Sequence, residues 1–568
     1  MVQRIIRLLN KEFGNTNQAA LLLGLFSLFS QILGLFRDRA LAHYIGPGQT
    51  LDIYYASFRI PDFIFVSIAS LFAVTAVLPL LSEKLGHSVD GELNKSSHES
   101  RSFFSNTFNF FFLVMLVISI FSYLILPKIA HIIAPGFDSD SILKVVNVSR
   151  IMLLSPIFLG LSNLFGSITQ LYKKFFLFSL SPIFYNVGII IGVIFLYPKF
   201  GINGLAFGVV LGACLHFLIQ LPIAFTHKFL PKISFYFNYV EIKKLLIMSL
   251  PRTLGLSMYN ITILVLVALA SLVASGSISI FNFAFNLQTV PTMIIGLSYA
   301  IATFPSLTRL FTLNDIKKFV DQIGSASRQI IFWSLPIVFL FIVLRAQIVR
   351  VILGSGNFSW DHTRLVAAML AVFSFSVLPQ SLNTLLVRAF YASGRTWRPL
   401  FINLFSTVFT VCFAFLALYL VKIFPQISIF INSSLRIENI IGTNILLLAL
   451  GYSIGIIINF FLLWYFFQKD FKQHIVKGYI SSTFIKSLTA SFAIGAVTYF
   501  FLGVFDNIFN LDKFFGILFQ GLFSGLIGII SGLITLWLLK SEELAQLIDT
   551  VKSKFWKAHV VAPSQEEL

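Results

Sequence analysis

The residues of this sequence with the clearest capacity for chemistry in an apolar setting lie near its N-terminal end. They are Arg37, Asp38, Arg39, Asp52, Arg59 and Asp62. A charged side chain at the centre of a bilayer costs at least about 2.5–3.5 kcal/mol, so such residues usually face a water-filled cavity or a charged partner. Arginine binds phosphate and carboxylate groups through paired hydrogen bonds. The group therefore predicts a cationic site for an anionic substrate.

The sequence leaves more than one possible ion-pair partner for the charged residues of this group. Asp38 can pair with Arg37 or Arg39, and Asp52 can pair with a nearby arginine. The alternative for Arg39 is a loop residue in a surface ion pair, because long arginine side chains reach easily from the end of a span to water.

One further arginine, Arg252, follows Pro251 at the start of a later apolar run. It either extends toward the membrane surface or adds positive charge to the same site.

Motifs for other chemistry are missing from the sequence. There is no G-x-x-x-x-G-K-[ST] phosphate loop, no H-E-x-x-H metal motif and no Cys/His spacing for zinc. The two cysteines, Cys214 and Cys412, lie inside apolar runs. We expect no enzymatic activity, no metal and no cofactor, and transport would be driven by an ion gradient, the membrane potential or removal of product.

Composition indicates the class of protein. Of the 568 residues, 57% are hydrophobic and only 11% are charged, against about 25% charged residues in soluble domains. The net charge of +18 is explained by loop Lys and Arg that orient membrane proteins. No basic run interleaved with aromatic residues lies outside the apolar segments, so nucleic acid is not an expected partner.

The apolar runs predict an all-α integral membrane protein. About 20 apolar residues cross a bilayer, and fourteen runs meet this length. They are 19–43, 52–82, 102–127, 146–172, 176–197, 202–226, 244–272, 277–304, 329–351, 365–392, 399–421, 441–467, 484–504 and 515–539.

The loop charges and a weak internal repeat indicate how these spans are oriented and grouped. Lys and Arg concentrate on every second loop and at both termini, which places the termini in the cytoplasm. Tyr55-Ala56 and Leu78-Pro79 are repeated by Phe283-Ala284 and Phe304-Pro305 at a similar offset, as in transporters with internal repeats. The predicted segments are an amphipathic segment 1–18, a first lobe 19–226, a linker 227–243, a second lobe 244–467, two further spans in 468–540, and a tail 541–568 that begins as an interfacial helix.

Several motifs in chain order carry a resemblance to a known family. They are Ser30–Asp38 (SQILGLFRD), Gly46–Gly48, Phe58–Pro61, Ala134–Phe137, Gln220–Pro222, Ala274–Ser277, Arg388–Ala392 and Arg398-Pro399. Their order and spacing over about 30–540 resemble the MurJ (MviN) lipid II flippases of the multidrug/oligosaccharidyl-lipid/polysaccharide exporter superfamily. Fourteen spans agree with this resemblance.

The resemblance implies a cavity between two six-helix lobes, lined by arginines that meet a lipid diphosphate. Arg37 matches one such position, and Asp52 matches an acidic position near the outer mouth. Gln31, Phe65 and Asn286 stand where three further arginines are expected.

The departures from the family pattern motivate a wider set of substrate-binding residues. Arg59 and Arg252 are candidates to supply the missing charge from nearby turns. The complete set is Arg37, Asp38, Asp52, Arg59, Arg252, Gln31 and Asn286.

The implied function is translocation of lipid II, a polyprenyl-diphosphate-linked peptidoglycan precursor, across the bacterial inner membrane by alternating access. Expected partners are the lipid-linked head group, membrane lipids and cell-wall synthesis proteins. The alternatives are a flippase for another lipid-linked oligosaccharide, an antiporter on the same scaffold, and a membrane scaffold that transports nothing.

Overall fold

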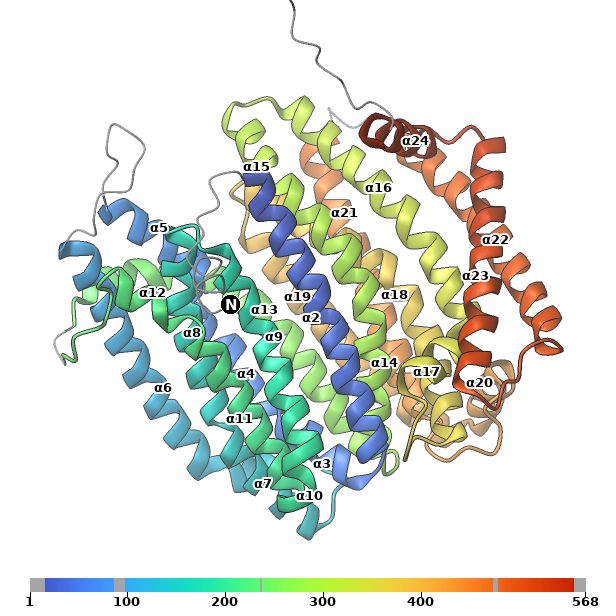
Figure 1. Ribbon diagram of the computed structural model, residues 1–568, viewed down its shortest axis with the longest axis horizontal. Coiled ribbons are helices and arrows are strands. Elements are labelled where there is room, and N and C mark those ends of the chain that lie inside the picture. Colours follow the sequence, from blue (N-terminus) through green and yellow to red (C-terminus); the bar gives the residue numbers. More distant parts are fainter. Residues whose placement is uncertain (1–15, 86–97, 235–236, 473–478, 556–568) are drawn as a thin grey trace, which may run out of the picture. The chain divides into compact units, whose positions relative to one another are not determined.

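The computed structural model describes residues 16–85, 98–234, 237–472 and 479–555, and within these ranges every regular element is a helix (Figure 1). Thirteen helical segments are long and apolar enough to cross a membrane. Each overlaps one predicted span, which confirms the all-α membrane fold. Helix α2 (Thr16–Tyr44) covers the predicted first span but is not among the thirteen. The count of fourteen therefore stays a prediction.

The chain forms two compact units. Unit 1 comprises Met1–Val290, Ile352–Ser376 and Gly394–Leu463, and unit 2 comprises Pro291–Val351, Val377–Ser393 and Trp464–Leu568. The boundaries predicted from sequence for the two lobes and the linker stay predictions. Most of the predicted amphipathic segment 1–18 lies outside the described residues.

The first part of unit 1 is a bundle of long helices and short helical pieces. After α2 these are α3 (Gln49–Ser57), α4 (Arg59–Ser67), η1 (Ala69–Phe72), α5 (Val74–Leu85), α6 (His98–Ile133), α7 (Ser139–Met152), α8 (Leu154–Leu171), α9 (Phe175–Ile191), the π-helical turn η2 (Gly192–Leu196), α10 (Tyr197–Phe200), α11 (Ile202–Leu218) and α12 (Leu221–Thr226). The predicted span 52–82 is divided among α3, α4, η1 and α5. Ala73, with extended backbone angles (φ −66°, ψ 157°), separates η1 from α5.

Glycines set the spacing of α11 against α9 and the η2 turn that follows it. A Cβ atom on Gly188 would lie 2.2 Å from the Cα of Gly212, and one on Gly208 would lie 2.4 Å from the Cα of Gly192. Small residues let helix backbones approach closely in membranes, where packing replaces the hydrophobic effect as the driving force. Helix α9 also packs along α2, and this contact brings Asn186 of α9 to Arg37 of α2.

The remainder of unit 1 holds α14 in place. It contains α13 (Tyr239–Ser271), α14 (Ser277–Pro291), the first part of α18 (Trp360–Ala392), α19 (Trp397–Ile423), α20 (Pro425–Leu435) and most of α21 (Ile445–Phe471). On α14, Phe281 packs against Phe373 of α18 and Phe285 against Tyr452 of α21, each with ring centroids 5.4 Å apart. These aromatic contacts fix the rotation of α14.

Unit 2 contains η3 (Thr292–Leu297, a π-helical turn), α15 (Ser298–Thr312), α16 (Ile316–Val343), α17 (Arg345–Leu353, except its last two residues), the remaining parts of α18 and α21, α22 (Tyr479–Asp506), α23 (Phe514–Leu538) and α24 (Glu542–Phe555). The span predicted over 329–351 begins earlier in the structure, as part of α16. This helix begins earlier because Asp315 accepts a hydrogen bond from the Lys318 N–H as an N-cap.

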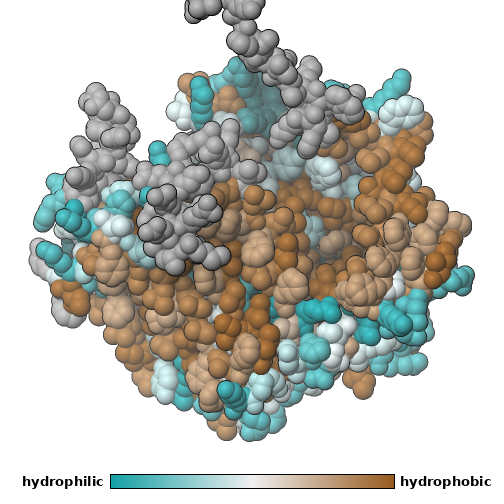
Figure 2. Space-filling model, in the orientation of Figure 1, coloured by the Kyte–Doolittle hydropathy of each residue, from teal (hydrophilic) through white to brown (hydrophobic). Residues whose placement is uncertain are grey.

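Helices α16, α22 and α23 pack together, and their outer surface is apolar. Large side chains such as Phe492 and Phe500 of α22 and Leu526 and Trp537 of α23 are exposed. Figure 2 shows this surface at the right of the view, where Figure 1 places α22 and α23. An exposed apolar face of this kind suits contact with lipid.

Helix α24, labelled in Figure 1, falls within the tail for which an interfacial helix is predicted. Buried charge anchors this helix. Arg328 of α16 is 6% exposed, and its Nη1 lies 3.0 Å from Glu542 and 3.5 Å from Glu543. The Thr483 hydroxyl donates to the buried Glu543 carboxylate at 2.6 Å, and the Ser541 hydroxyl donates at 2.8 Å.

This anchor predicts a loss of α24 docking in acid. Burial acts to raise the pKa of Glu543, but hydrogen bonds from Thr483, its own backbone and Ser541, with the charge of Arg328, bring that pKa below its ordinary value. A carboxyl with a depressed pKa stabilises the folded state above its unfolded-state pKa, and the contribution is lost as pH falls through the folded-state value. Amide exchange of α24, corrected for intrinsic rates, is expected to rise as the pH falls below about 4.

The control is Glu543→Gln, in which exchange of α24 should already be fast at neutral pH and should change little with acid. Equal protection of α24 in the wild type at pH 7 and pH 3 would show that Glu543 does not anchor the helix.

Candidate functional site

The centre of the candidate site is an ion pair between neighbours on α2. Arg37 donates from Nε and Nη2 to Asp38 Oδ1 at 2.9 and 2.8 Å. The Asp38 side chain is 4% exposed and that of Arg37 is 24% exposed. The structure therefore resolves the choice of partner for Asp38 in favour of Arg37. Arg39 instead donates to the backbone carbonyl of Ile352 at 3.2 Å.

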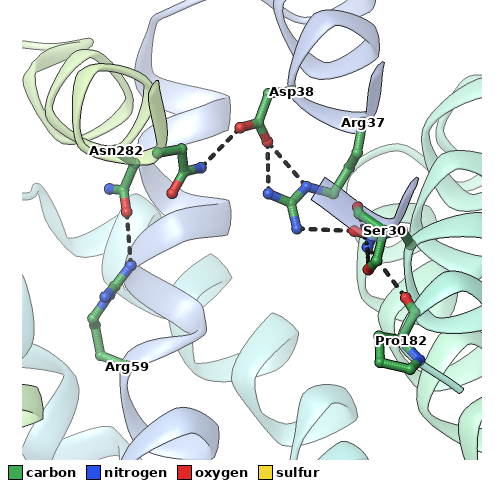
Figure 3. A network of polar contacts seen from close by, with 8 residues as sticks. Ser30, Arg37, Asp38, Arg59, Pro182 and Asn282 are labelled. Carbon is green, nitrogen blue, oxygen red and sulfur yellow. Dashed lines mark hydrogen bonds and ion pairs between the residues drawn. The ribbon is translucent and has the colours of Figure 1, made fainter. Parts of the chain in front are cut away.

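Asn186 of α9 holds the other side of the Arg37 guanidinium (Figure 3). Its Oδ1 accepts from Arg37 Nη1 at 3.3 Å, while its Nδ2 donates to the backbone carbonyls of Pro182 and Ser30. The amide of Asn186 thereby links α9 to α2 in two places. These bonds set the orientation of the Asn186 amide, which ties Arg37 to the packing of α9 against α2.

Two asparagines on α14 complete the network. Asn286 donates from Nδ2 to Asp38 Oδ2 at 2.9 Å, and Arg59 Nη2 donates to Asn282 Oδ1 at 3.0 Å (Figure 3). The two asparagines are four residues apart, so they lie on one face of the helix. Arg59 also donates from Nε to the Tyr55 carbonyl at 3.1 Å. The site thus joins α2 and α4 to α9 and α14.

Asp52 of α3 binds the start of α14. Its carboxylate accepts from the backbone N–H of Gly276 at 2.7 Å, and from the N–H and hydroxyl of Ser279 at 2.8 and 2.6 Å. Asp52 is fully buried. The expectation that Asp52 pairs with an arginine is therefore wrong. The N-terminal N–H groups of a helix attract a carboxylate strongly enough to serve in place of a cation.

The other predicted residues stand apart from these bonds. Gln31 lies half-buried on α2, and within the described part of the chain it makes no hydrogen bond. Arg252 is exposed on α13 and takes no part in the bonds described above. The structure thus brings together Arg37, Asp38 and Asn286 of the predicted set, and it places Arg59 at a second point on the same α14 face.

Sequence reasoning missed Asn186, Asn282 and Ser279. Asn282 could have been found from its spacing, because it is one helical turn from Asn286. Asn186 is an amide within an apolar run, which is a weaker signal. Nothing in the sequence points to Ser279 as a partner of Asp52.

The arrangement offers oriented positive charge. A guanidinium has five N–H donors, and the described residues engage Arg37 through three hydrogen bonds. The two remaining N–H groups, on a partly exposed side chain, are available to an anionic oxygen. Among the described residues, no group of three or more His, Cys, Asp or Glu side chains lies close enough to hold a metal ion.

Comparison with known proteins identifies relatives over most of the chain. The family model described as "Lipid II flippase MurJ" matches residues 41–520. A probable lipid II flippase MurJ of Buchnera aphidicola subsp. Schizaphis graminum is 27% identical over 88% of this chain and 92% of its own length. That of Borreliella burgdorferi is 24% identical over 85% of this chain and 89% of its own.

Solved structures give the same fold. A lipid II flippase MurJ in an inward closed conformation matches with a TM-score of 0.69 at 22% identity, covering 93% of this chain and 100% of that chain. A multidrug resistance transporter of the MATE family matches with a TM-score of 0.62 at 15% identity, covering 79% of this chain and 96% of that chain. Since the family model spans most of the sequence, the family expected from the motifs is confirmed, and the chain belongs to the MurJ family of lipid II flippases.

Proposed function

We propose that this chain translocates lipid II from the cytoplasmic to the outer leaflet of a bacterial inner membrane. Family membership makes the chain a multi-pass membrane transporter rather than an enzyme. The observation that carries the proposal is Arg37, a partly exposed guanidinium held by Asp38 and Asn186 with two N–H groups available. Arginine in this state suits a diphosphate, because its planar donors match phosphate oxygens in pairs.

The other site residues have separate proposed roles. Asp38 orients Arg37, and Asn286 holds the second oxygen of Asp38. Arg59, positioned by Asn282, supplies a second cation. Gln31 and Arg252 are proposed to contact the head group from α2 and α13.

Alternating access is proposed to work through contacts that can open and re-form. Asp52 ties α3 to the start of α14 through three hydrogen bonds, and we propose that they close the site toward the outer face. Both termini would lie in the cytoplasm, as the distribution of loop charges favours.

A second substrate class is favoured by particular residues. Gln31, Phe65 and Asn286 occupy positions where the family resemblance implies arginine. A site with fewer cations favours a lipid-linked oligosaccharide whose head group carries less negative charge.

The experiment that separates these functions is a flipping assay on the purified chain in vesicles. Equal concentrations of lipid II and of a polyprenyl monophosphate-linked sugar are compared, with complementation of a flippase-depleted bacterium as a second readout. We expect lipid II to move at least about tenfold faster than the monophosphate lipid, since a second phosphate adds charge-assisted hydrogen bonds of about 1.5–3 kcal/mol each. A preference for the monophosphate lipid would favour the second class, and movement of neither would support a scaffold role.

A further inference from the structure

An apolar cavity lies between α23 and α24 in unit 2, outside the candidate transport site. It has a volume of about 360 Å³, and only hydrophobic side chains line it. Leu533, Ile534 and Trp537 form the α23 wall, and Leu547 and Ile548 form the α24 wall. The cavity is open to the protein surface rather than enclosed, so its apolar lining is accessible to a molecule outside the protein.

The cavity is maintained by contacts that do not involve its contents. Leu544 of α24 packs into a buried cluster with Phe332 of α16, Ala490 of α22 and Leu536 of α23, and Leu547 packs against that cluster. The ion pairs of Arg328 with the first turn of α24 secure the same helix from the polar side. Because α24 is fastened independently, the space beneath it is preformed.

The cavity opens on the apolar surface of α23, near two lysines that lie at the end of that helix. Trp537 and Ile534 are 68% and 53% exposed on the apolar surface of α23. Just beyond this wall, Lys486 donates from Nζ to the backbone carbonyl of Lys540 at 3.1 Å, and the Lys540 side chain is exposed. Lys486 of α22 thus reaches the end of α23, where the exposed Lys540 follows the lining residue Trp537 by three positions. An exposed tryptophan of this kind is enriched at membrane interfaces.

We propose that this cavity binds one acyl chain of an anionic glycerophospholipid, with its phosphate beside Lys486 and Lys540. The lining without polar atoms fits a hydrocarbon chain, which loses no hydrogen bonds on entry. Lys and Arg side chains near a membrane surface attract anionic lipid head groups. This lipid would stabilise unit 2 by binding the folded state alone, and the inference does not depend on the transported substrate.

The test is lipid binding by the purified full-length chain, measured by native mass spectrometry during titration with phosphatidylglycerol, phosphatidylethanolamine or polyprenyl phosphate. Ile534→Trp fills the cavity from the α23 wall. Leu526→Trp is the matched control, because Leu526 is 47% exposed on the same helix and is not among the lining residues. Ile548→Phe fills the cavity from the α24 wall. It replaces Ile534→Trp in the binding test if Ile534→Trp lowers the unfolding temperature of the protein.

We expect the wild type and Leu526→Trp to retain one phosphatidylglycerol, and both filling variants to bind it at least about tenfold more weakly. Lys486→Gln combined with Lys540→Gln should remove the preference for phosphatidylglycerol over phosphatidylethanolamine. Equal binding by filled and control variants would overturn the cavity as the site. If the wild type binds both phospholipids with equal affinity, the proposed anionic head group is wrong. If the wild type prefers polyprenyl phosphate and Ile534→Trp abolishes that binding, the proposed occupant is wrong.

Discussion

Arg37→Ala is expected to reduce the rate of lipid II flipping by roughly a hundredfold or more. A hydrogen bond to a charged group is worth about 1.5–3 kcal/mol, and Arg37 has two N–H groups to offer a phosphate beyond those held by Asp38 and Asn186. Arg37→Lys should recover only part of the rate, because a lysine ammonium cannot form the paired geometry. The measurement is initial flipping rate in vesicles with matched protein density.

Two variants separate the role of Arg37 from general damage. Arg150→Ala removes an arginine that stacks on the Tyr123 ring, 4.2 Å from its centroid, and it should leave flipping within about twofold of the wild type. Asn186→Leu keeps the Arg37 charge but removes its partner on α9. We expect Asn186→Leu to reduce the apparent affinity for lipid II more than the maximal rate. Wild-type flipping by Arg37→Ala would exclude Arg37 from diphosphate binding.

Asp52→Ala is expected to destabilise the start of α14 by about 3 kcal/mol or more. The change leaves the buried N–H groups of Gly276 and Ser279 without their acceptor, and each unsatisfied buried group costs about 1–3 kcal/mol. Hydrogen exchange at the first turn of α14 should rise by at least about a hundredfold, and the unfolding temperature should fall. If the proposed closing role is correct, flipping also slows.

Two control variants show how much of the effect of Asp52→Ala comes from its hydrogen bonds. Ser279→Ala removes one of the three bonds, that from the hydroxyl, and should raise exchange by a smaller factor. Asp140→Ala removes a carboxylate that is 69% exposed and pairs with Lys144, and surface pairs contribute at most about 1 kcal/mol. If Asp52→Ala exchanges no faster than Asp140→Ala, the carboxylate does not hold α14.

The membrane fold could be predicted from sequence because it depends on local properties. Each span must satisfy its backbone hydrogen bonds internally, so the length of an apolar run predicts a helix without knowledge of its neighbours. The boundaries of the span predicted at 329–351 were less accurate. There the N-cap Asp315 starts α16 in a polar stretch that hydropathy does not count, and a separate helix, Arg345–Leu353, follows its end.

The site was predictable only to the extent that its partners are neighbours in sequence. Arg37 and Asp38 are adjacent, so their pairing is a local possibility that sequence can name. Asn186 lies 149 residues from Arg37, and Asn282 lies 223 residues from Arg59. These contacts depend on helix packing and on the rotation of α14, which a single sequence does not specify.

Asp52 shows most clearly which information comes from the sequence and which comes from the tertiary structure. The sequence by itself determined that a carboxylate near the end of a span needs a partner, because an ionised group without one is costly in an apolar setting. Only the tertiary structure decided that this partner is the start of α14 rather than an arginine. The physical reason is that backbone N–H groups carry no sequence signature, so their placement against Asp52 comes from folding alone.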